Sequence, residues 1–509
     1  MLSDTGKTDS LWMVTVPPRT PLPLTTDLRT EVCVIGAGIA GLTTAYLLAK
    51  AGKRVVVLED GAIGGGETGR TTAHLSNALD DRYYVLERLH GAEGARTAAA
   101  SHTAAIDQIE SIVRDEAIDC AFQRLDGYLF VPPGKSTGVL EQELEAARRA
   151  GVAGVELAKR APMLPFDTGP CLRFPRQGQF HPLSYLNGLV VAFERMGGRI
   201  FGKTHVSGVD PGPPVQTQTT GGHTVTADFV VCATNTPVVD WLVIHSKQAA
   251  YRTFAIGART TGQIPPALYW DTEDPYHYVR LSGDVLIVGG EDHKTGQADD
   301  GEERLHRLER WTRERFPVGP VEFRWSGQVM EPVDGLGYIG RNPGDKGHVF
   351  VATGDSGHGM THGTIAGLLI TDLIQGRANK WERLYDPARK SLKASGEYAK
   401  ENINVAKQYA DYLTSGEVHS EAEIRPGHGA VVRDGLKKFA VYRDEAGTPR
   451  RASAVCPHLG CIVHWNSLEQ SWDCPCHGSR FGTDGAVLNG PALGGLDLQE
   501  LEPGSAERA

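Results

Sequence analysis

The sequence contains no long apolar run. No stretch approaches the roughly 20 consecutive apolar residues that a membrane-spanning helix requires. The first residues, Met1 to Thr30, are polar and rich in proline, and they contain neither an apolar signal core nor a twin-arginine pair. We therefore expect a protein without an integral membrane segment that is located in the cytoplasm.

Positive charge and cysteine are both in short supply. Lys and Arg total 52 against 62 Asp and Glu, so the net charge is −10 and nucleic acid is not an expected partner. Four of the eight cysteines are scattered singly, which is typical of reduced, buried thiols. These four are Cys33, Cys120, Cys171 and Cys232.

The other four cysteines stand in two short boxes near the C-terminus. The boxes are Cys456-Pro-His458-Leu-Gly-Cys461 and Cys474-Pro-Cys476-His477-Gly-Ser479. Two thiolates and two imidazoles in paired loops suit a 2Fe-2S cluster of the Rieske type, in which histidines replace two of the cysteine ligands. Zinc is the alternative, because Cys and His at close spacing also hold zinc. Zinc takes only four ligands, however, and the boxes supply six candidates.

The boxes closely resemble those of the Rieske subunits of cytochrome bc complexes, including Gly460 and Gly478-Ser479. The resemblance covers roughly residues 421–505. It implies that Cys456, His458, Cys474 and His477 hold the irons and that Cys461 and Cys476 form a disulfide. The sequence departs from the pattern at Phe481, where high-potential members carry Tyr. Loss of that hydroxyl donor should lower the reduction potential, although Ser479 can still donate.

A glycine turn between two strands marks the other end of the chain. An apolar run, Glu31 to Ile35, is followed by Gly36-Ala-Gly38-Ile-Ala-Gly41, a helical segment from Leu42 to Ala51, and a second strand closed by Glu59. This order predicts a dinucleotide-binding unit, and a structural βαβ unit without ligand is the alternative. Gly36 makes the turn, Gly38 admits the pyrophosphate, and Gly41 lets helix and strand pack closely. Glu59 accepts hydrogen bonds from the ribose.

The dinucleotide is expected to be FAD rather than NAD. A flavoprotein that also binds NADH in this manner usually shows a second fingerprint, and Val288-Gly-Gly290 lacks both the third glycine and a helix. Two later strands fit the nucleotide end, one ending at Thr234 and one preceding a glycine loop and a helix. The loop residues expected at the cofactor are Gly354, Gly357, Gly359 and Thr361. The helix N-terminus would stabilise negative charge on the reduced ring.

Together these segments resemble the D-amino-acid oxidase superfamily of FAD proteins over about residues 30–376. The resemblance implies an amine or amino-acid donor that loses hydride to the flavin. The loop from Gly64 to His74 corresponds to a stretch that wraps the FAD, so Arg70, Thr71 and His74 are expected at the cofactor. Thr71 to His74 is also similar to the segment whose histidine is covalently joined to flavin in dimethylglycine dehydrogenase-like members. A hydrogen bond to the cofactor, or a surface position, is the alternative for His74.

The expected fold is therefore α/β, a Rossmann-like FAD domain with an antiparallel substrate sheet, plus a small all-β Rieske domain. With 509 residues the chain is too long for one core, and we expect these domains in sequence. The FAD-dependent oxidoreductase domain spans 30–376, with its substrate sheet mainly within 85–180 and 250–325. A helical linker spans 377–420, and the Rieske domain spans 421–509.

Catalytic residues are not carried over from the resemblance, because they vary in that family. Four residues are weak candidates from their positions: His181, Arg252, Tyr278 and His358. An arginine such as Arg252 or Arg280 would pair with a substrate carboxylate. Asp355, His358 and His362 approximate the iron motif of Rieske oxygenases, but their spacing is one residue short and the domain order is reversed.

The predicted function is an FAD-dependent oxidoreductase, an amine or amino-acid dehydrogenase acting on CH–NH groups. Its FAD passes electrons to the Rieske cluster, which hands them singly to an external acceptor of unknown identity. A plain oxidase would not need the cluster, since reduced flavin reacts with oxygen directly. Two alternatives stay open. One is an electron-transfer module or redox sensor without a small-molecule substrate, and the other is a Rieske-type oxygenase.

Overall fold

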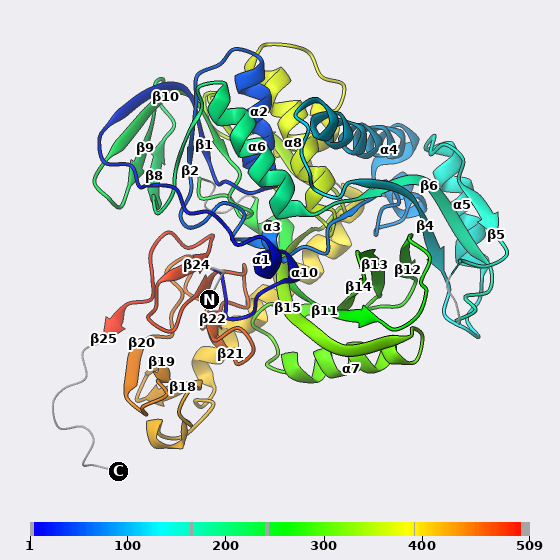
Figure 1. The fold of residues 1–509 in the computed structure, drawn as a ribbon. Coiled ribbons are helices and arrows are strands. Elements are labelled where there is room, and N and C mark those ends of the chain that lie inside the picture. The colour runs from blue at the N-terminus through cyan, green and yellow to red at the C-terminus, as the bar shows by residue number, and fades with distance from the viewer. Residues whose placement is uncertain (1–4, 163–165, 240–243, 391, 500–509) are drawn as a thin grey trace.

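The computed structural model describes residues 5–162, 166–239, 244–390 and 392–499 (Figure 1). The last ten residues of the expected 421–509 domain therefore lie outside the described residues. Two large sheets form the body of the molecule, and two small sheets form a separate lobe at the C-terminal end. Among the described residues, no helix combines the length and apolarity that crossing a bilayer requires.

The first sheet is mostly parallel. Its strands are β1 (Leu28–Ile35), β2 (Val55–Leu58), β7 (Arg199–Phe201), β8 (Val206–Asp210), β9 (Val215–Thr219), β10 (Thr224–Cys232), β16 (Tyr338–Arg341) and β17 (Val349–Thr353). The order is β16-β17-β10-β1-β2-β7, with β8 and β9 attached beside β10. The chain moves from β1 to β2 on one side and to β10 on the other, so β1 lies at a topological switch point. Ligands bind outside the carboxyl ends of the strands at such a point.

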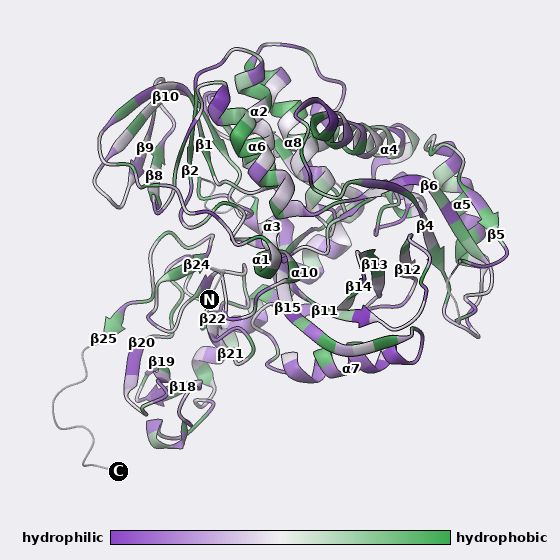
Figure 2. Ribbon diagram, in the orientation of Figure 1, coloured by the Kyte–Doolittle hydropathy of each residue, from purple (hydrophilic) through white to green (hydrophobic). Residues whose placement is uncertain are grey.

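Helices α2 (Ile39–Lys50) and α8 (Gly359–Ile374) pack on this sheet and against each other, and α6 (Pro182–Arg195) packs on α2. Both α2 and α8 are apolar around most of their circumference because each is covered on several sides. Gly363 and Gly367 of α8 face the backbone of α2 so closely that a side chain at either would collide with it. Figure 2 shows apolar residues concentrated in these central helices, whereas α7 (Gly301–Arg313), at the rim, is largely hydrophilic.

The second sheet forms the other half of the body. Its strands are β3 (His74–Leu75), β4 (Gln123–Phe130), β5 (Glu156–Ala158), β6 (Cys171–Gln179), β11 (Gln248–Thr260), β12 (Leu268–Asp271), β13 (Tyr278–Ser282), β14 (Val285–Lys294) and β15 (Val318–Pro332). The order is β15-β11-β14-β13-β12-β4-β6-β3, with β5 on β6. All pairs are antiparallel except β4 with β12. The sheet extends beyond the expected segments, to β3 on one side and to Pro332 on the other.

Further helices surround the sheets. They are α1 (Leu11–Thr15), α3 (Glu67–Arg70), α4 (Tyr83–Asp115), α5 (Gly138–Arg149), α9 (Glu382–Tyr385) and the 3-10 turn η1 (His245–Lys247). Helix α4 kinks at Gly91, whose φ of 76° is open to glycine without strain. Helix α7 packs on β11, β14 and β15 and covers one face of the second sheet.

The C-terminal lobe contains two four-stranded antiparallel sheets. They are β18 (Gly429–Asp434), β19 (Lys437–Arg443), β20 (Pro449–Ser453) and β25 (Leu498–Gln499), and β21 (His464–Asn466), β22 (Ser471–Asp473), β23 (Arg480–Phe481) and β24 (Val487–Asn489). The helical stretch expected from Leu392 to Leu413 is present as η2 (Leu392–Ala394), α10 (Ser395–Gln408) and η3 (Tyr409–Leu413), followed by η4 (Glu421–Glu423). The predicted fold class, α/β with an antiparallel sheet plus a small all-β domain, is confirmed.

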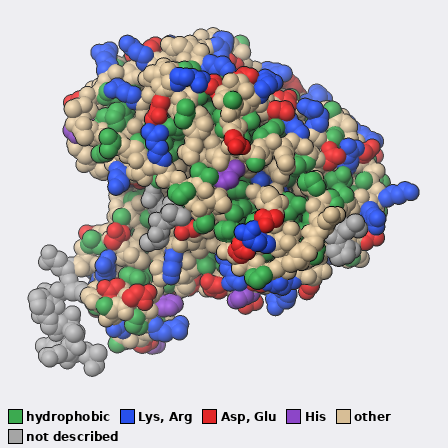
Figure 3. Space-filling view, in the orientation of Figure 1, with side chains coloured by type: hydrophobic (Ala, Val, Ile, Leu, Met, Phe, Trp, Pro, Cys, Tyr) green, Lys and Arg blue, Asp and Glu red, His purple; other side chains and the backbone are tan. Residues whose placement is uncertain are grey.

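The lobe rests against the body rather than hanging free. Helix α10 runs between them, and Lys294 of β14 forms an ion pair with Glu401 of α10 at 2.5 Å. The N-terminal segment also joins the two parts, because the Lys7 N–H donates to the Glu469 carbonyl at 3.1 Å. On the face shown in Figure 3, acidic and basic side chains of the described residues are interspersed.

Candidate functional site

A cavity of about 590 Å³ lies where the body and the C-terminal lobe meet. One end is formed by the glycine turn after β1 and by the carboxyl ends of β10 and β17. The second sheet supplies another wall through β11, β13, β14 and β15. The lobe contributes Val487 to Gly490 and Ala492, so the cavity is closed by residues from all three parts of the chain.

The glycine turn has the geometry that a dinucleotide requires. Gly36 has a φ of 102°, and a Cβ there would overlap the Ala233 carbonyl. A Cβ at Gly41 would overlap the Gly36 carbonyl oxygen, so only glycine lets α2 start this close to β1. Gly38 is the N-cap of α2 and lines the cavity. Glu59 lies under the turn, where its carboxylate accepts the Ala37 N–H at 2.5 Å.

Most other residues expected at the cofactor also line the cavity: Thr71, His74, Thr234, Gly354, Gly357 and Gly359. Thr361 does not line it. Its hydroxyl lies 2.9 Å from Nδ1 of His102 on α4 and donates to the His358 carbonyl, so it serves the packing of α8 on α4.

His74 has a neutral imidazole in the wall of the cavity. Its Nδ1 lies 3.1 Å from the Thr72 hydroxyl, and its Nε2 lies 3.4 Å from the Val279 carbonyl. Burial, with the nearby Arg280 charge, lowers its pKa to about 3. The preceding residue, Ala73, has a φ of 59°, a strained conformation for a residue with a side chain. Asn235, Glu291 and Ser356, all beside the cavity, share this left-handed conformation.

Arg70 lines the cavity and also joins the lobe to the body. Its guanidinium is fully buried and donates to Glu469 of the C-terminal lobe at 3.1 Å and to the Ser326 carbonyl at 2.8 Å. Arg70 was expected at the cofactor, and its position in the cavity wall is compatible with that prediction. Its pairing with Glu469 was not expected, because the two residues lie 399 positions apart in sequence.

Unpaired polar atoms around the cavity fit a polar ligand such as FAD. Among the described residues, four buried side-chain atoms of cavity-lining residues have no hydrogen-bond partner: Asn235 Nδ2, Thr236 Oγ1, Trp270 Nε1 and Asp292 Oδ1. A buried polar group without a partner costs about 1–3 kcal/mol, so such groups mark places where a ligand supplies the partner. The glycine turn, the helix N-terminus and these atoms together fit bound FAD.

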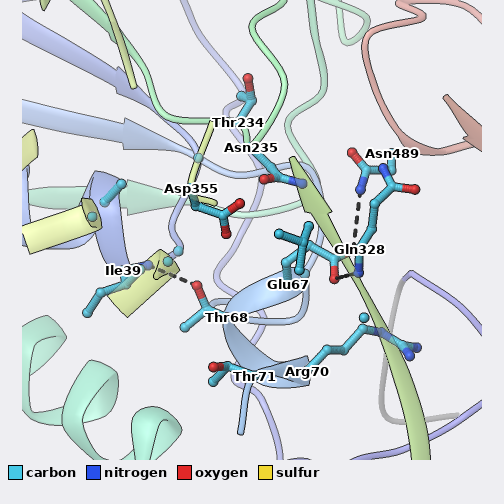
Figure 4. Close-up of a pocket in the computed structure, with 18 of the residues that line it drawn as sticks. Ile39, Glu67, Thr68, Arg70, Thr71, Thr234, Asn235, Gln328, Asp355 and Asn489 are labelled. Carbon is cyan, nitrogen blue, oxygen red and sulfur yellow. Dashed lines mark hydrogen bonds between the residues drawn. The ribbon is translucent and has the colours of Figure 1, made fainter. Parts of the chain in front are cut away.

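Carboxyl groups from the second sheet and from two neighbouring loops line the cavity. Asp80 accepts a hydrogen bond from the Tyr276 hydroxyl at 2.7 Å, and its own N–H donates to His358 Nε2 at 3.0 Å. Burial raises the pKa of Asp292 to about 7, and the charge of Asp80 contributes in the same direction. Asp355 accepts the Met330 N–H at 3.0 Å and points toward the middle of the cavity (Figure 4).

Two of the four catalytic candidates reach the cavity and two do not. Tyr278 and His358 line it, and the Tyr278 hydroxyl lies 2.6 Å from the Thr253 hydroxyl. His181 instead caps α6 by accepting the Ser184 N–H at 3.2 Å. Arg252 is buried on the side of the lobe, where it donates to the Ser326 hydroxyl at 2.6 Å.

The three residues that approximate an iron motif have other partners. His362 Nδ1 donates to the Asp355 carbonyl at 2.7 Å, and His358 Nε2 accepts the Asp80 N–H. These bonds hold the imidazoles to the backbone around the glycine loop. Arg280 is the other arginine considered for a substrate carboxylate. Its guanidinium donates instead to the backbone carbonyls of Thr72, Ala73 and Phe180.

The two cysteine-histidine boxes meet at one end of the lobe. The rings of His458 and His477 lie 5.0 Å apart, and Cys456 and Cys474 are buried beside each other. The Cys461–Cys476 disulfide is present and joins the two loops. Two thiols and two imidazoles gathered in this way fit a 2Fe-2S cluster.

The histidines of the cluster site face the body of the molecule. The His458 ring lies 5.0 Å from the ring of His245, which is buried in η1. Beside His477, the Gly478 carbonyl accepts a hydrogen bond at 2.9 Å from the Gln328 side chain of β15. Gln328 also lines the cavity, so one residue touches both the cavity and the cluster loop.

Three further residues that line the cavity were not expected from the sequence. Glu67 accepts the Gln328 N–H at 2.6 Å and the Asn489 side-chain amide at 3.3 Å (Figure 4). Glu67 thereby ties α3, β15 and the C-terminal lobe together at the cavity wall. Asp80 and Asp292 were also missed, although the acidic pair that ends the apolar strand β14 could have drawn attention to Asp292.

A buried charge network seals the same junction. Glu469 lies within 3.9 Å of Arg252 as well as pairing with Arg70, and Arg480 donates to Asp473 at 3.0 Å. Burial alone would raise the pKa of Glu469, but the arginine charges hold it at about 2. The lobe is therefore docked through ionised groups that are out of contact with water.

Known protein families match both parts of the chain. The FAD dependent oxidoreductase model matches residues 31–373, and the Rieske [2Fe-2S] domain model matches residues 415–500. The putative Rieske 2Fe-2S iron-sulfur protein YhfW of Bacillus subtilis is 31% identical, over 94% of this chain and 94% of the relative. The gamma-glutamylputrescine oxidoreductase of Escherichia coli is 28% identical, over 70% of this chain and 87% of the relative.

The fold of the body also matches solved structures. The crystal structure of glycine oxidase from Geobacillus kaustophilus aligns with a TM-score of 0.59 at 19% identity, covering 71% of this chain and 99% of that chain. The cofactors that these families carry, FAD and a 2Fe-2S cluster, are those that the cavity and the paired loops fit. The chain belongs to the FAD-dependent oxidoreductase family of the D-amino-acid oxidase type, and it carries a Rieske [2Fe-2S] domain at its C-terminal end.

Proposed function

We propose that the protein is a dehydrogenase of amines or amino acids whose electrons cross from the FAD cavity to the Rieske domain of the same chain and leave to an external acceptor. Bound FAD supplies a hydride acceptor for a carbon next to nitrogen, and the 2Fe-2S cluster supplies a one-electron carrier. Relatives support the chemistry, since one is named for gamma-glutamylputrescine and a structural neighbour for glycine.

The observation that carries the proposal is the contact between the two redox sites. Gln328 forms part of the cavity wall and donates to the Gly478 carbonyl, next to the cluster residue His477. The fixed position of the lobe supports transfer within one chain, because the buried Arg70–Glu469 pair and the Glu67 hydrogen bonds hold the lobe in contact with the cavity.

The residues of the chain would bind and orient the two cofactors. Gly36, Gly38 and Gly41 bring the backbone of the α2 N-terminus to the dinucleotide, and Glu59 serves its ribose. The lobe residues Val487 to Asn489 form part of the cavity wall, where they would shield bound FAD from water. Cys456, His458, Cys474 and His477 would hold the cluster.

An anaerobic titration with a panel of amines and amino acids tests the proposal. We expect one class of compound to bleach the flavin absorbance and then to produce the electron paramagnetic resonance signal of a reduced Rieske cluster in the same sample. If every compound leaves the flavin oxidised while a reduced ferredoxin-type protein bleaches it, the protein is an electron-transfer module instead. Bleaching without any cluster signal would contradict transfer within the chain.

A further inference from the structure

The wall of the cavity opposite the glycine turn is acidic. Asp292 and Glu331 line the cavity from the second sheet, Asp80 from the loop before α4, and Asp355 from the loop after β17 of the first sheet. Asp81 and Glu331 both lie within hydrogen-bond distance of the Ser356 hydroxyl, at 2.7 and 3.0 Å. Asp80 accepts a hydrogen bond from the Tyr276 hydroxyl at 2.7 Å, and Asp292 lies on β14.

Among the described lining residues, no arginine or lysine neutralises the carboxyl groups of this wall. The lining includes two permanently charged side chains, Arg70 and Lys203. Arg70 forms an ion pair with Glu469. Lys203 lies at the nucleotide end of the cavity, where the N–H of the next residue, Thr204, donates to the Glu59 carbonyl at 2.9 Å. Arg252 and Arg280 are buried outside the cavity on Ser326 and on backbone carbonyls. Within the part of the lining that the structure describes, this wall thus offers no arginine or lysine to pair with a carboxylate.

Asp292 has an unpaired oxygen in the cavity wall. Its Oδ1 is buried and has no hydrogen-bond partner, while Thr253 contributes a hydrogen bond to the carboxyl. Burial raises its pKa to about 7, which is the cost of keeping a carboxylate out of water where the charges of Arg304 and His277 offset that burial only in part. An ammonium group placed beside it would remove that cost and supply the N–H donor that Oδ1 lacks.

We infer that the substrate is a cationic amine without a carboxylate on the reacting carbon, and that Asp292, with Asp80 opposite it, is the specificity-determining anchor for its ammonium group. This inference rests on the proposed function, because it assigns the substrate class of the same cavity. Tyr276 and Tyr278 would form the apolar sides around the ammonium, a setting in which aromatic faces also favour a cation.

Two unreactive isosteres test the charge preference without turnover. tert-Butylammonium has no hydrogen on the carbon next to nitrogen, and pivalate has the same shape with the opposite charge. Each is titrated into the FAD-loaded protein, and binding is followed by the perturbation of the flavin absorption spectrum. We expect tert-butylammonium to bind about tenfold or more tightly than pivalate, since hydrogen bonds to charged groups contribute about 1.5–3 kcal/mol. Tighter binding of pivalate, or binding of neither ion, would overturn the inference.

The variant Asp292→Asn assigns the preference to one side chain. We expect it to weaken tert-butylammonium binding about tenfold or more while FAD content is unchanged. Asp284→Asn is the matched control, because Asp284 is an exposed aspartate at the opposite end of the β13–β14 hairpin, paired with Arg259. Asp80→Asn serves as the second variant if Asp292→Asn does not fold. Unchanged binding in both pocket variants would refute the assignment.

Matched substrates separate this inference from the proposed function. Cadaverine is lysine without its carboxylate, and putrescine is ornithine without its carboxylate. We expect kcat/KM to favour the diamine of each pair about tenfold or more. If only the amino acids reduce the flavin, the inference fails and the proposed dehydrogenase stands. If tert-butylammonium binds through Asp292 but no amine or amino acid reduces the flavin, the proposed function fails and the cation site stands.

Discussion

The two redox sites of this molecule are built in opposite ways. All donors of the cluster site lie within residues 456–479, in two loops joined by a disulfide. The FAD cavity draws on residues from Thr5 to Ala492, including a wall from the Rieske domain itself. The compact cluster site thus depends on one sequence segment, whereas the dispersed cavity depends on how the domains pack. A substitution at the cluster site should therefore either abolish cluster content or leave it unchanged. Substitutions around the cavity should reduce FAD content by different amounts.

The largest effect is expected at the cluster. Cys474→Ser removes one of the four proposed protein ligands, and we expect complete loss of the cluster with FAD retained. Iron and acid-labile sulfide analysis, together with the flavin spectrum, measure this directly. Cys171→Ser is the control, because Cys171 is a buried free cysteine of the second sheet and its loss should leave iron content unchanged. Retention of iron by Cys474→Ser would contradict the proposed role of Cys474 as a cluster ligand.

At the cavity, the strongest effect is expected from the glycine turn. A side chain at Gly41 collides with the Gly36 carbonyl, so Gly41→Val should shift the start of α2 and reduce FAD content to a small fraction of the wild-type value. Cluster content should stay at the wild-type level, because its ligands come from another segment. Gly396→Ala, in α10 with open space around it, should change neither cofactor. Flavin-to-protein and iron-to-protein ratios provide the readout.

The junction between the sites should respond next. Glu469→Gln leaves Arg70 buried without its counter-charge, and we expect the free energy of unfolding to fall by about 3–5 kcal/mol. Glu194→Gln breaks the solvent-exposed pair with Arg19 and should cost less than about 1 kcal/mol. Denaturant unfolding followed by flavin fluorescence and by the cluster spectrum compares the two variants. Equal stabilities would contradict a docking role for the buried pair.

The same carboxyl predicts an acid dependence. The arginine charges hold the folded-state pKa of Glu469 at about 2, below its value of about 4.3 in an unfolded chain. A depressed pKa contributes stability that is fully present above about pH 4.3 and is lost as the pH falls toward 2. Wild-type stability should therefore decline through this window more steeply than that of Glu469→Gln. Parallel pH profiles for the two proteins would disprove this contribution.

The smallest expected change is in the cluster potential. Phe481 is fully buried in the core of the lobe with Cys456 and Cys474, and Phe481→Tyr would bring a hydroxyl donor toward the cluster sulfurs. We expect the reduction potential to rise, because hydrogen bonds to the sulfurs stabilise the reduced state. Redox titration monitored by electron paramagnetic resonance measures the shift. A potential that stays constant or falls would show that the hydroxyl does not reach the cluster.

Sequence reasoning succeeded where a residue acts through backbone geometry or local spacing. Gly36 and Gly41 were identifiable because no other residue fits their close contacts, and the cysteine-histidine boxes because their members are neighbours. It did not reveal that Arg70 and Arg252 pair across the domain junction. Nothing near an arginine in sequence reveals a carboxylate several hundred residues away. Gln328 and Asn489 went unnoticed for the same reason, since an amide acquires its role only when two domains meet.

The Rieske wall of the cavity limits how this protein can be divided. A fragment ending before α10 would lack Val487 to Asn489, and its cavity would be open to solvent on that side. It would also lack Glu469, which leaves the Arg70 guanidinium without its carboxylate partner. The oxidoreductase body and the Rieske domain therefore do not behave as independent domains. Transplanting this oxidoreductase body onto a different electron carrier would require the new carrier to reproduce that wall.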